Sequence, residues 1–274
     1  MRLGTAHLTA LDLAPLALVR AAARAGLGAV GLRLMPASPG GTFYSLDAAA
    51  IAELKRALRQ EDVTVREVEF ISIVPDIVAA DFLPLFEAGA ELGAECVTVS
   101  GDDPDPLRLI ANFATLCDLA APFGLRLDLE FMRWRDIATP EQAIEVVEGA
   151  DRPNASVLVD ALHLMRCGSG VEALADIPPS RLRCVQLCDA PLTAPPTLTD
   201  IIAEAREGRL MPGEGALPLI PLLHALPRDI AMSVEVPMPG LSAEERLMRA
   251  AAAARRIIAD ARRTSAHNSQ GGHA

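Results

Sequence analysis

Short runs of apolar and β-branched residues alternate along the chain with longer alanine- and leucine-rich runs that have helical spacing. Such alternation is typical of a parallel sheet with helices between its strands. The short runs predict strands at Leu3–Leu8, Ala29–Leu34, Thr64–Ile71, Cys96–Ser100, Arg126–Phe131, Ser156–Asp160, Arg183–Cys188 and Ile230–Val236. Eight strand–helix units in about 264 residues favour a closed (β/α)8 TIM barrel of the α/β class over an open sheet.

The longer runs predict eight helices, several of which begin with Ser, Thr or Pro in the first turn. Their expected ranges are Pro15–Ala25, Leu46–Gln60, Phe82–Leu92, Leu107–Phe123, Pro140–Val147, a short one near Val171–Leu174, Leu217–Ala225 and Ser242–Arg263. Residues 1–263 are therefore expected to form one barrel domain. The polar, glycine-rich segment 264–274 is expected to be a disordered tail, whose histidines His267 and His273 have no role.

The stretch between Asp189 and Leu217 is longer than an ordinary strand-to-helix connection. Long loops in compact domains usually act as lids or binding loops. This one contains the turn sequence Met-Pro-Gly-Glu-Gly, in which Gly213 and Gly215 permit positive φ. We expect it to lie beside a functional site.

The charge balance excludes several classes of partner. The chain has 25 basic and 36 acidic residues and a net charge of -11, which disfavours nucleic acid and anionic membrane surfaces. No apolar run approaches the roughly 20 residues of a membrane span. Lys55, the only lysine, follows an apolar stretch at the start of a polar helix face, which argues against Schiff-base chemistry.

The five cysteines form an odd set without a CxxC pair, and we expect buried thiols in a reducing compartment. The first residues have no apolar core of an export signal, so we expect a cytoplasmic protein. No GxGxxG or Walker pattern provides a nucleotide site, and no GxSxG elbow is present. The sequence leaves the oligomeric state open, a homo-oligomer included.

Oxygen-bearing side chains follow one another at the ends of four consecutive predicted strands: Glu130, Asp160, Gln186 and Glu235. In a barrel these ends surround one cavity. Carboxylates gathered in one cavity repel unless they are protonated or neutralised by a cation. Oxygen ligands favour hard divalent ions such as Mg²⁺ or Mn²⁺ over zinc. Under the alternative interpretation, Gln186 and Asp189 only hydrogen-bond the neighbouring loop.

Five motifs carry a family resemblance: Leu-Glu130-Phe, Val-Asp160-Ala-Leu-His163, Val-Gln186-Leu-Cys-Asp189, Gly-Arg-Leu-Met-Pro-Gly-Glu-Gly215 and Val-Glu235-Val-Pro. With them the chain resembles the xylose isomerase-like barrels, which include sugar-phosphate isomerases and epimerases, over about residues 1–262. The resemblance implies one divalent metal ion, Mn²⁺ or Mg²⁺ with Co²⁺ or Zn²⁺ as alternatives, held by Glu130, Asp160, Gln186 and Glu235. At the position of Gln186 the family most often has histidine. In having glutamine there, the chain resembles some dehydroshikimate dehydratases.

Other predicted strand ends supply candidate substrate-binding residues, namely His7, Arg33, Glu69, and Ser100 with Asp102. Arg33 and Arg209 are suited to grip a carboxylate, a phosphate or a sugar hydroxyl, with a structural salt bridge as the alternative for each. His163 follows Asp160 by one helical turn and is either an acid/base or a hydrogen-bonded support. Arg133 and Trp134 are candidates for a pocket wall, although packing alone also explains Trp134.

The resemblance implies a metal-dependent isomerase or epimerase of a small sugar or polyhydroxylated keto compound. The reaction passes through an enediolate, with Glu130 and Glu235 exchanging the proton. One alternative is a lyase of the dehydroshikimate dehydratase type, which Gln186 favours. Another is a catalytically silent barrel that binds a sugar or a protein partner. A three-zinc DNA-repair endonuclease would need more pocket histidines than His7 and His163 and a less acidic surface.

Overall fold

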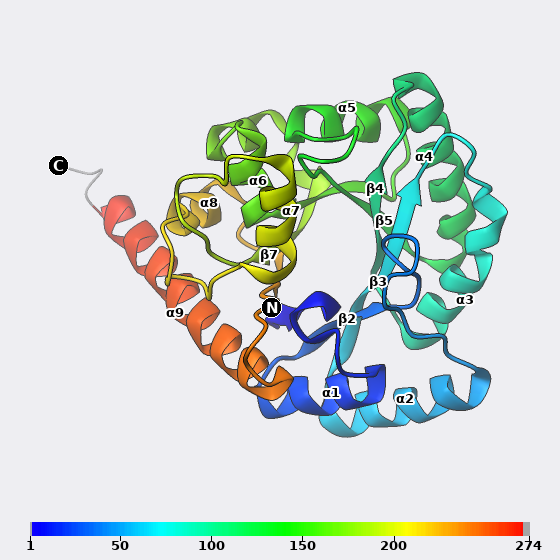
Figure 1. Cartoon of the computed structure of the whole chain (residues 1–274), viewed down its shortest axis with the longest axis horizontal. Coiled ribbons are helices and arrows are strands. Elements are labelled where there is room, and N and C mark those ends of the chain that lie inside the picture. Colours follow the sequence, from blue (N-terminus) through cyan, green and yellow to red (C-terminus); the bar gives the residue numbers. More distant parts are fainter. Residues whose placement is uncertain (1, 271–274) are drawn as a thin grey trace.

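A computed structural model describes residues 2–270, with side chains described through residue 265. Its eight parallel strands pair in chain order, and β1 closes the barrel by pairing with β8 (Figure 1). The strands are β1 Gly4–Thr5, β2 Ala29–Arg33, β3 Thr64–Ile73, β4 Cys96–Gly101, β5 Arg126–Glu130, β6 Ala155–Asp160, β7 Leu182–Leu187 and β8 Ala231–Val234. The predicted (β/α)8 barrel is confirmed, and so are its eight strands.

Helices surround the barrel on its outside (Figure 1). They are α1 Pro15–Arg24, α2 Ala48–Glu61, α3 Leu83–Leu92, α4 Pro106–Ala120, α5 Pro140–Ala150, α6 Ala161–Cys167, α7 Leu198–Glu207, α8 Leu219–Ala225 and α9 Ala243–Gln270. Short 3-10 segments are η1 His7–Ala10, η2 Ala79–Phe82, η3 Ala121–Phe123, η4 Val171–Asp176 and η5 Pro179–Arg181. The short helix expected near Val171 is thus a 3-10 segment, and His7 lies in η1, beyond the end of β1.

The sequence patterns missed α6 and α7. Helix α6 begins directly at the end of β6, where Asp160 serves as its N-cap and accepts a hydrogen bond from the His163 backbone amide. No turn residues separate that strand from its helix, so no boundary signal exists. Helix α7 lies within the stretch expected to be one long loop and is capped by Thr197. That loop prediction was wrong, because the segment contains a helix that buries Ile201 and Ala205.

Alternation along the strands separates two sets of buried side chains. Apolar residues such as Val68, Val97 and Leu127 belong to the hydrophobic core beneath the helices. Buried polar residues lie at intervening positions, among them Glu67 and Asp128. We infer that these polar side chains fill the interior of the barrel and extend to the carboxyl ends of the strands.

Helix α9 extends to Gln270 and so enters the segment 264–274 that was expected to be a disordered tail. The side chain of His267 lies outside the described residues, as does all of His273. The division into a barrel of residues 1–263 and a tail therefore stays a prediction. Within residues 2–270, no helix is both long and apolar enough to cross a membrane. All five cysteines are free thiols, and Cys167 is the one that is only partly buried.

Candidate metal and catalytic site

The four predicted metal ligands lie at the carboxyl ends of neighbouring strands. Glu130 ends β5, Asp160 ends β6, Gln186 lies opposite Asp160 on β7, and Glu235 directly follows β8. All four are buried, with at most 6% of each residue exposed. Since parallel strands present these ends at one edge, the fold directs them to the same end of the barrel.

His163 joins this group from the first turn of α6. Ligand-type atoms of Glu130, Asp160 and His163 all lie within 4.8 Å of one another. The His163 Nε2 atom is 3.6 Å from Glu130 Oε1, while its backbone amide donates to Asp160 Oδ1 at 2.9 Å. Trp134 packs edge-on against the imidazole at a centroid distance of 5.0 Å. His163 is thereby held against both carboxylates.

Arg209 lies at the centre of the site and is almost fully buried. Its Nη1 atom donates to Asp160 Oδ2 at 2.5 Å, and its Nη2 atom lies 3.0 Å from Glu235 Oε2. Its Nε atom donates to the Ala205 carbonyl, which fixes the side chain against α7. Arg209 therefore pairs with protein carboxylates, the alternative that the sequence left open. A grip on substrate stays a prediction for this residue.

A second buried ion pair joins Arg33 and Glu69, with 2.6 Å between Arg33 Nη2 and Glu69 Oε2. Beside it, His7 accepts a hydrogen bond from the Arg33 amide at Nδ1 and lies 2.9 Å from the Leu13 carbonyl at Nε2. Both ring nitrogens thus face backbone groups, and the Nε2–H tautomer satisfies both. Burial lowers the pKa of His7, which keeps the ring neutral.

Three other predicted neighbours contact protein groups. Asp102 forms an ion pair with Arg135, and Arg133 donates to the Arg166 carbonyl on α6. Ser100 lies 3.5 Å from the Ser72 hydroxyl. These contacts account for the three residues without a ligand, so their place in a substrate pocket stays a prediction.

Burial and like charge set the protonation of the glutamates. Burial, followed by the charges of Glu235 and Asp160, raises the pKa of Glu130 well above its ordinary value. Burial also raises the pKa of Glu235 to about 7, although Arg209 opposes the shift. For Asp160, burial alone would raise the pKa, but Arg209 and His163 bring it below the ordinary value. Burial lowers the pKa of His163 to about 4.

The donor set fits a divalent cation. Gln186 Oε1 is buried and has no hydrogen-bond partner within the described residues, which leaves its lone pairs available. Because His163 is neutral, the positive charges paired with the carboxylates Glu69, Asp160 and Glu235 are the guanidinium groups of Arg33 and Arg209, and Glu130 adds a fourth carboxylate. An excess of two negative charges remains when all four carboxylates are ionised, which one divalent ion would balance.

The alternative interpretation, hydrogen bonding to the neighbouring loop, describes Asp189 and not Gln186. Its carboxylate accepts from the backbone amides of Ala190, Gly213 and Leu217 at 2.8–2.9 Å. Gly213 has a φ of +88°, whereas Gly215 is needed because an added Cβ would lie 2.5 Å from the Ala190 carbonyl oxygen. Asp189 thus organises the loop that carries Arg209, while Gln186 does not.

Comparison with known proteins identifies the family. The sequence profile of the xylose isomerase-like TIM barrels matches residues 19–258. The chain belongs to this family. Among solved structures, this xylose isomerase-like barrel is similar to the IOLI protein with a binding zinc atom. The TM-score is 0.79 at 22% identity, covering 95% of this chain and 99% of that one.

It is also similar to a fusion of a xylose isomerase-like TIM barrel with a 4-hydroxyphenylpyruvate dioxygenase. Here the TM-score is 0.82 at 19% identity, covering 98% of this chain and 44% of the fusion. At these identities the two structures show the shared fold.

Curated relatives of this family barrel include two kinds of enzyme. A 3-dehydroshikimate dehydratase of Pseudomonas aeruginosa is 33% identical over 135 residues, covering 48% of this chain and 21% of the relative. An inosose isomerase of Bacillus subtilis is 32% identical over 120 residues, covering 43% of this chain and 41% of the relative. The chain thus matches about a fifth and two fifths of the lengths of these relatives.

The structure adds residues that the sequence analysis did not select. Tyr44 stacks on His7 at a centroid distance of 5.2 Å. Arg166 on α6 forms a buried ion pair with Glu204 on α7 at 2.7 Å, which joins the two missed helices. Its position one turn beyond His163 was the only available signal, and Glu204 had none. The first contact packs against His7, and the second holds α6, which carries His163, against α7.

Proposed function

We propose that this xylose isomerase-like barrel is an isomerase or epimerase of a small sugar or polyhydroxylated keto compound. The observation that carries the proposal is a pair of buried glutamates, Glu130 and Glu235, at the carboxyl end of the barrel. Each glutamate contacts a different neighbouring side chain. Glu130 faces His163, and Glu235 faces Arg209. A proton donor and a proton acceptor with separately tuned surroundings are what isomerisation beside a carbonyl requires.

In this mechanism Glu235 removes the proton from the carbon beside the carbonyl. Arg209, 3.0 Å from Glu235 Oε2, holds that carboxylate in place. Glu130 returns a proton to the enediolate, at the opposite face of the same carbon in an epimerase or at the neighbouring carbon in an isomerase. In the isomerase the hydroxyl proton also passes to the other oxygen of the enediolate, so that the carbonyl group changes place. His163 positions Glu130 from 3.6 Å and stays neutral, since burial lowers its pKa to about 4.

Glu130, Asp160, Gln186 and Glu235 would hold one divalent ion, Mn²⁺ or Mg²⁺ by the hardness of their oxygens. Bound there, the ion would polarise the substrate carbonyl and stabilise negative charge on its oxygen. The zinc atom of the IOLI structure supports a divalent ion but leaves Zn²⁺ and Co²⁺ as alternatives. A carboxylate has two oxygens, so a glutamate ligand can still transfer a proton.

A dehydratase is the second candidate. It would begin with the same proton removal by Glu235, after which the hydroxyl group on the next carbon would take a proton from Glu130 and leave as water. The 33% identity to the 3-dehydroshikimate dehydratase supports it, as does Gln186 in place of histidine. The five free cysteines support a cytoplasmic location for either enzyme.

One experiment separates the two reactions. Purified protein, loaded with Mn²⁺ or stripped with EDTA, is incubated in D2O with inosose, dehydroshikimate and a panel of keto and aldo sugars. We expect a product of unchanged composition that has gained deuterium, and only with metal present. A product that has lost water would establish the dehydratase instead. Absence of both deuterium exchange and product from the metal-loaded protein, for every substrate, would overturn both candidates.

A further inference from the structure

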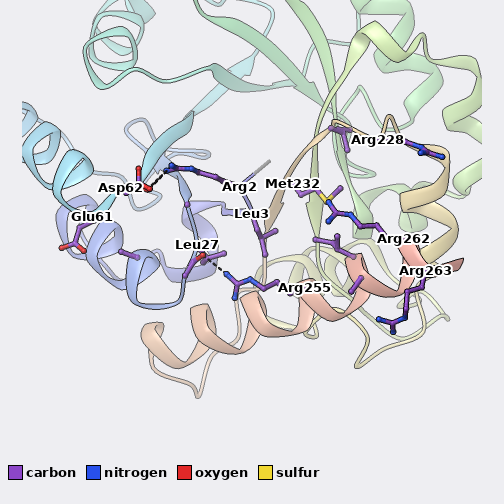
Figure 2. A pocket seen from close by; sticks show the side chains of 16 residues that line it. Arg2, Leu3, Leu27, Glu61, Asp62, Arg228, Met232, Arg255, Arg262 and Arg263 are labelled. Carbon is purple, nitrogen blue, oxygen red and sulfur yellow. Dashed lines mark hydrogen bonds and ion pairs between the residues drawn. The ribbon is translucent and has the colours of Figure 1, made fainter. Parts of the chain in front are cut away.

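A cavity lies at the opposite end of the barrel from the carboxylates. Its volume is about 740 Å³, within the range of small-molecule sites. It is lined by the residues that precede or begin β1, β2, β3 and β8, together with one face of α9. Figure 2 shows side chains from these separate segments around it. Neither the proposed reaction nor the metal ligands use this cavity.

Five arginines line the cavity: Arg2, Arg228, Arg255, Arg262 and Arg263. Arg2 pairs with Asp62 at 2.8 Å, and Arg263 pairs with Asp260. Arg255 donates to the Gly26 carbonyl at 2.7 Å, which satisfies a donor but leaves its charge uncompensated. Within the described residues, Arg228 and Arg262 form no ion pair.

The uncompensated charge points to an anionic occupant. Apart from Asp62, Glu61 is the one carboxylate in the cavity lining, against three arginines for which no ion pair is found among the described residues. Two positive charges therefore remain in excess, in a chain whose net charge is -11. A bound dianion would balance both charges, because guanidinium groups bind phosphate and carboxylate oxygens through paired donors.

The floor of the cavity is apolar. It comprises Leu3, Leu27, Ile230, Met232 and Ile258. In Figure 2 the Arg262 side chain extends from α9 toward Met232, so that cationic and apolar surfaces adjoin. A ligand that satisfies both surfaces carries its charge at one end and an apolar body at the other.

We propose that this cavity binds a small organic dianion, a phosphate monoester or a dicarboxylate with an apolar body. The arginines hold the charged groups, and the apolar floor covers the body. The site is independent of the proposed function, because none of its lining residues belongs to the catalytic end.

Calorimetric titration of the full chain at low ionic strength tests this, with phenyl phosphate and isophthalate as the two dianions. Inorganic phosphate and phenol serve as the separate halves of the first probe. We expect saturable binding of at least one dianion, tighter than either half and weakened by added NaCl. A preference between the two identifies the ligand as a phosphate monoester or a dicarboxylate. No binding of either, or equal binding of inorganic phosphate, would overturn the proposal.

Variants place the binding at this cavity rather than at the catalytic end. Arg228→Ser and Arg262→Ser should each weaken dianion binding about tenfold, since both side chains are exposed and form no ion pair with the part of the chain that the structure describes. Arg256→Ser is the matched control, because Arg256 is exposed on the same helix but does not line the cavity. Equal affinity in all three variants would refute the site. So would a change of oligomeric state on Arg262→Ser without any anion binding, because the occupant would then be a second copy of the chain.

Discussion

Glu235 shows how one residue depends on its surroundings for its chemistry. It is 6% exposed, its Oε2 atom lies 3.0 Å from Arg209 Nη2, and burial raises its pKa to about 7. A carboxylate with a pKa near the working pH can both accept and release a proton. The neighbouring arginine limits how far burial can raise that pKa.

Glu235→Gln should reduce turnover by roughly 10²–10⁴-fold while the barrel stays folded. Glutamine keeps the volume and one carbonyl oxygen, so packing and part of the coordination survive, but the proton acceptor is lost. Steady-state kinetics and circular dichroism measure the two effects. Glu145→Gln, at an exposed position on α5, is the control and should behave as wild type. Near wild-type turnover of Glu235→Gln would exclude the acid/base role, while an unfolded variant would show that the residue is structural.

Gln186→Leu should weaken Mn²⁺ binding about tenfold or more, because leucine has no oxygen to offer in place of the unpartnered Oε1 atom. Gln186→His should keep metal binding and shift preference toward Zn²⁺ or Co²⁺, since imidazole nitrogen suits softer ions. Competition with a fluorescent chelator measures both affinities. If the leucine variant binds Mn²⁺ as tightly as wild type, Gln186 is not a ligand.

Glu67 lies inside the barrel with both carboxylate oxygens buried and no hydrogen-bond partner within the described residues. Burial, and then the charge of Glu69, raises its pKa well above the ordinary value. The folded state therefore holds this proton more tightly than the unfolded state does. Stability from this group is present below the unfolded pKa and is lost as pH rises toward the folded pKa.

Glu67→Gln should consequently raise the free energy of unfolding, by roughly 1–3 kcal/mol at pH 8 and by less at pH 5. Glutamine keeps the shape without a charge to bury. Thermal melts across this pH range provide the measurement, and Glu91→Gln, exposed at the end of α3, is the control. A stability difference that does not vary with pH would contradict the assigned titration.

At the scale of elements, the segment after β7 illustrates how a loop is fixed by one side chain. The Asp189 carboxylate accepts three backbone amides, and the Asp189 and Leu210 backbones also form an antiparallel bridge. Arg209 immediately precedes this bridge. Its guanidinium is therefore delivered to the carboxylates by the loop rather than by a strand.

Asp189→Ala should free residues 208–217 and lower global stability by roughly 1–3 kcal/mol, because three amides lose their acceptor. Hydrogen exchange followed by mass spectrometry should show faster exchange in this segment and little change in β2–β4. Asp189→Asn, which keeps one carbonyl acceptor, should have a smaller effect. Unchanged protection of residues 208–217 in the alanine variant would show that the loop is held by other contacts.

At the scale of the whole molecule, buried carboxylates lie at the carboxyl end of the barrel, and an excess of arginines lines the cavity at the other end. A divalent ion at the carboxylates relieves repulsion that the folded state otherwise retains. Mn²⁺ at 100-fold its dissociation constant should stabilise the chain by about 2.7 kcal/mol, and EDTA should reverse the effect. Thermal melts with and without metal measure it. Absence of any shift at saturating Mn²⁺ would exclude a metal site that depends on folding.

The sequence alone determined the barrel and the four strand-end ligand candidates, from Glu130 to Glu235. Alternating strand and helix patterns encode a parallel sheet, and parallel strands bring their carboxyl ends together whatever their separation in the chain. The patterns missed α6 because Asp160 is both a strand end and a helix cap.

Only the tertiary structure decided which charges meet. It placed Arg209 between Asp160 and Glu235, separated Asp189 from Gln186, and brought Arg2 and Arg262 to one cavity. Ion pairing depends on distances of a few ångströms between side chains from distant segments. The periodicity of a sequence indicates which face of an element a residue occupies. It does not indicate which oppositely charged side chain the residue will meet, because that depends on the folded arrangement of distant segments.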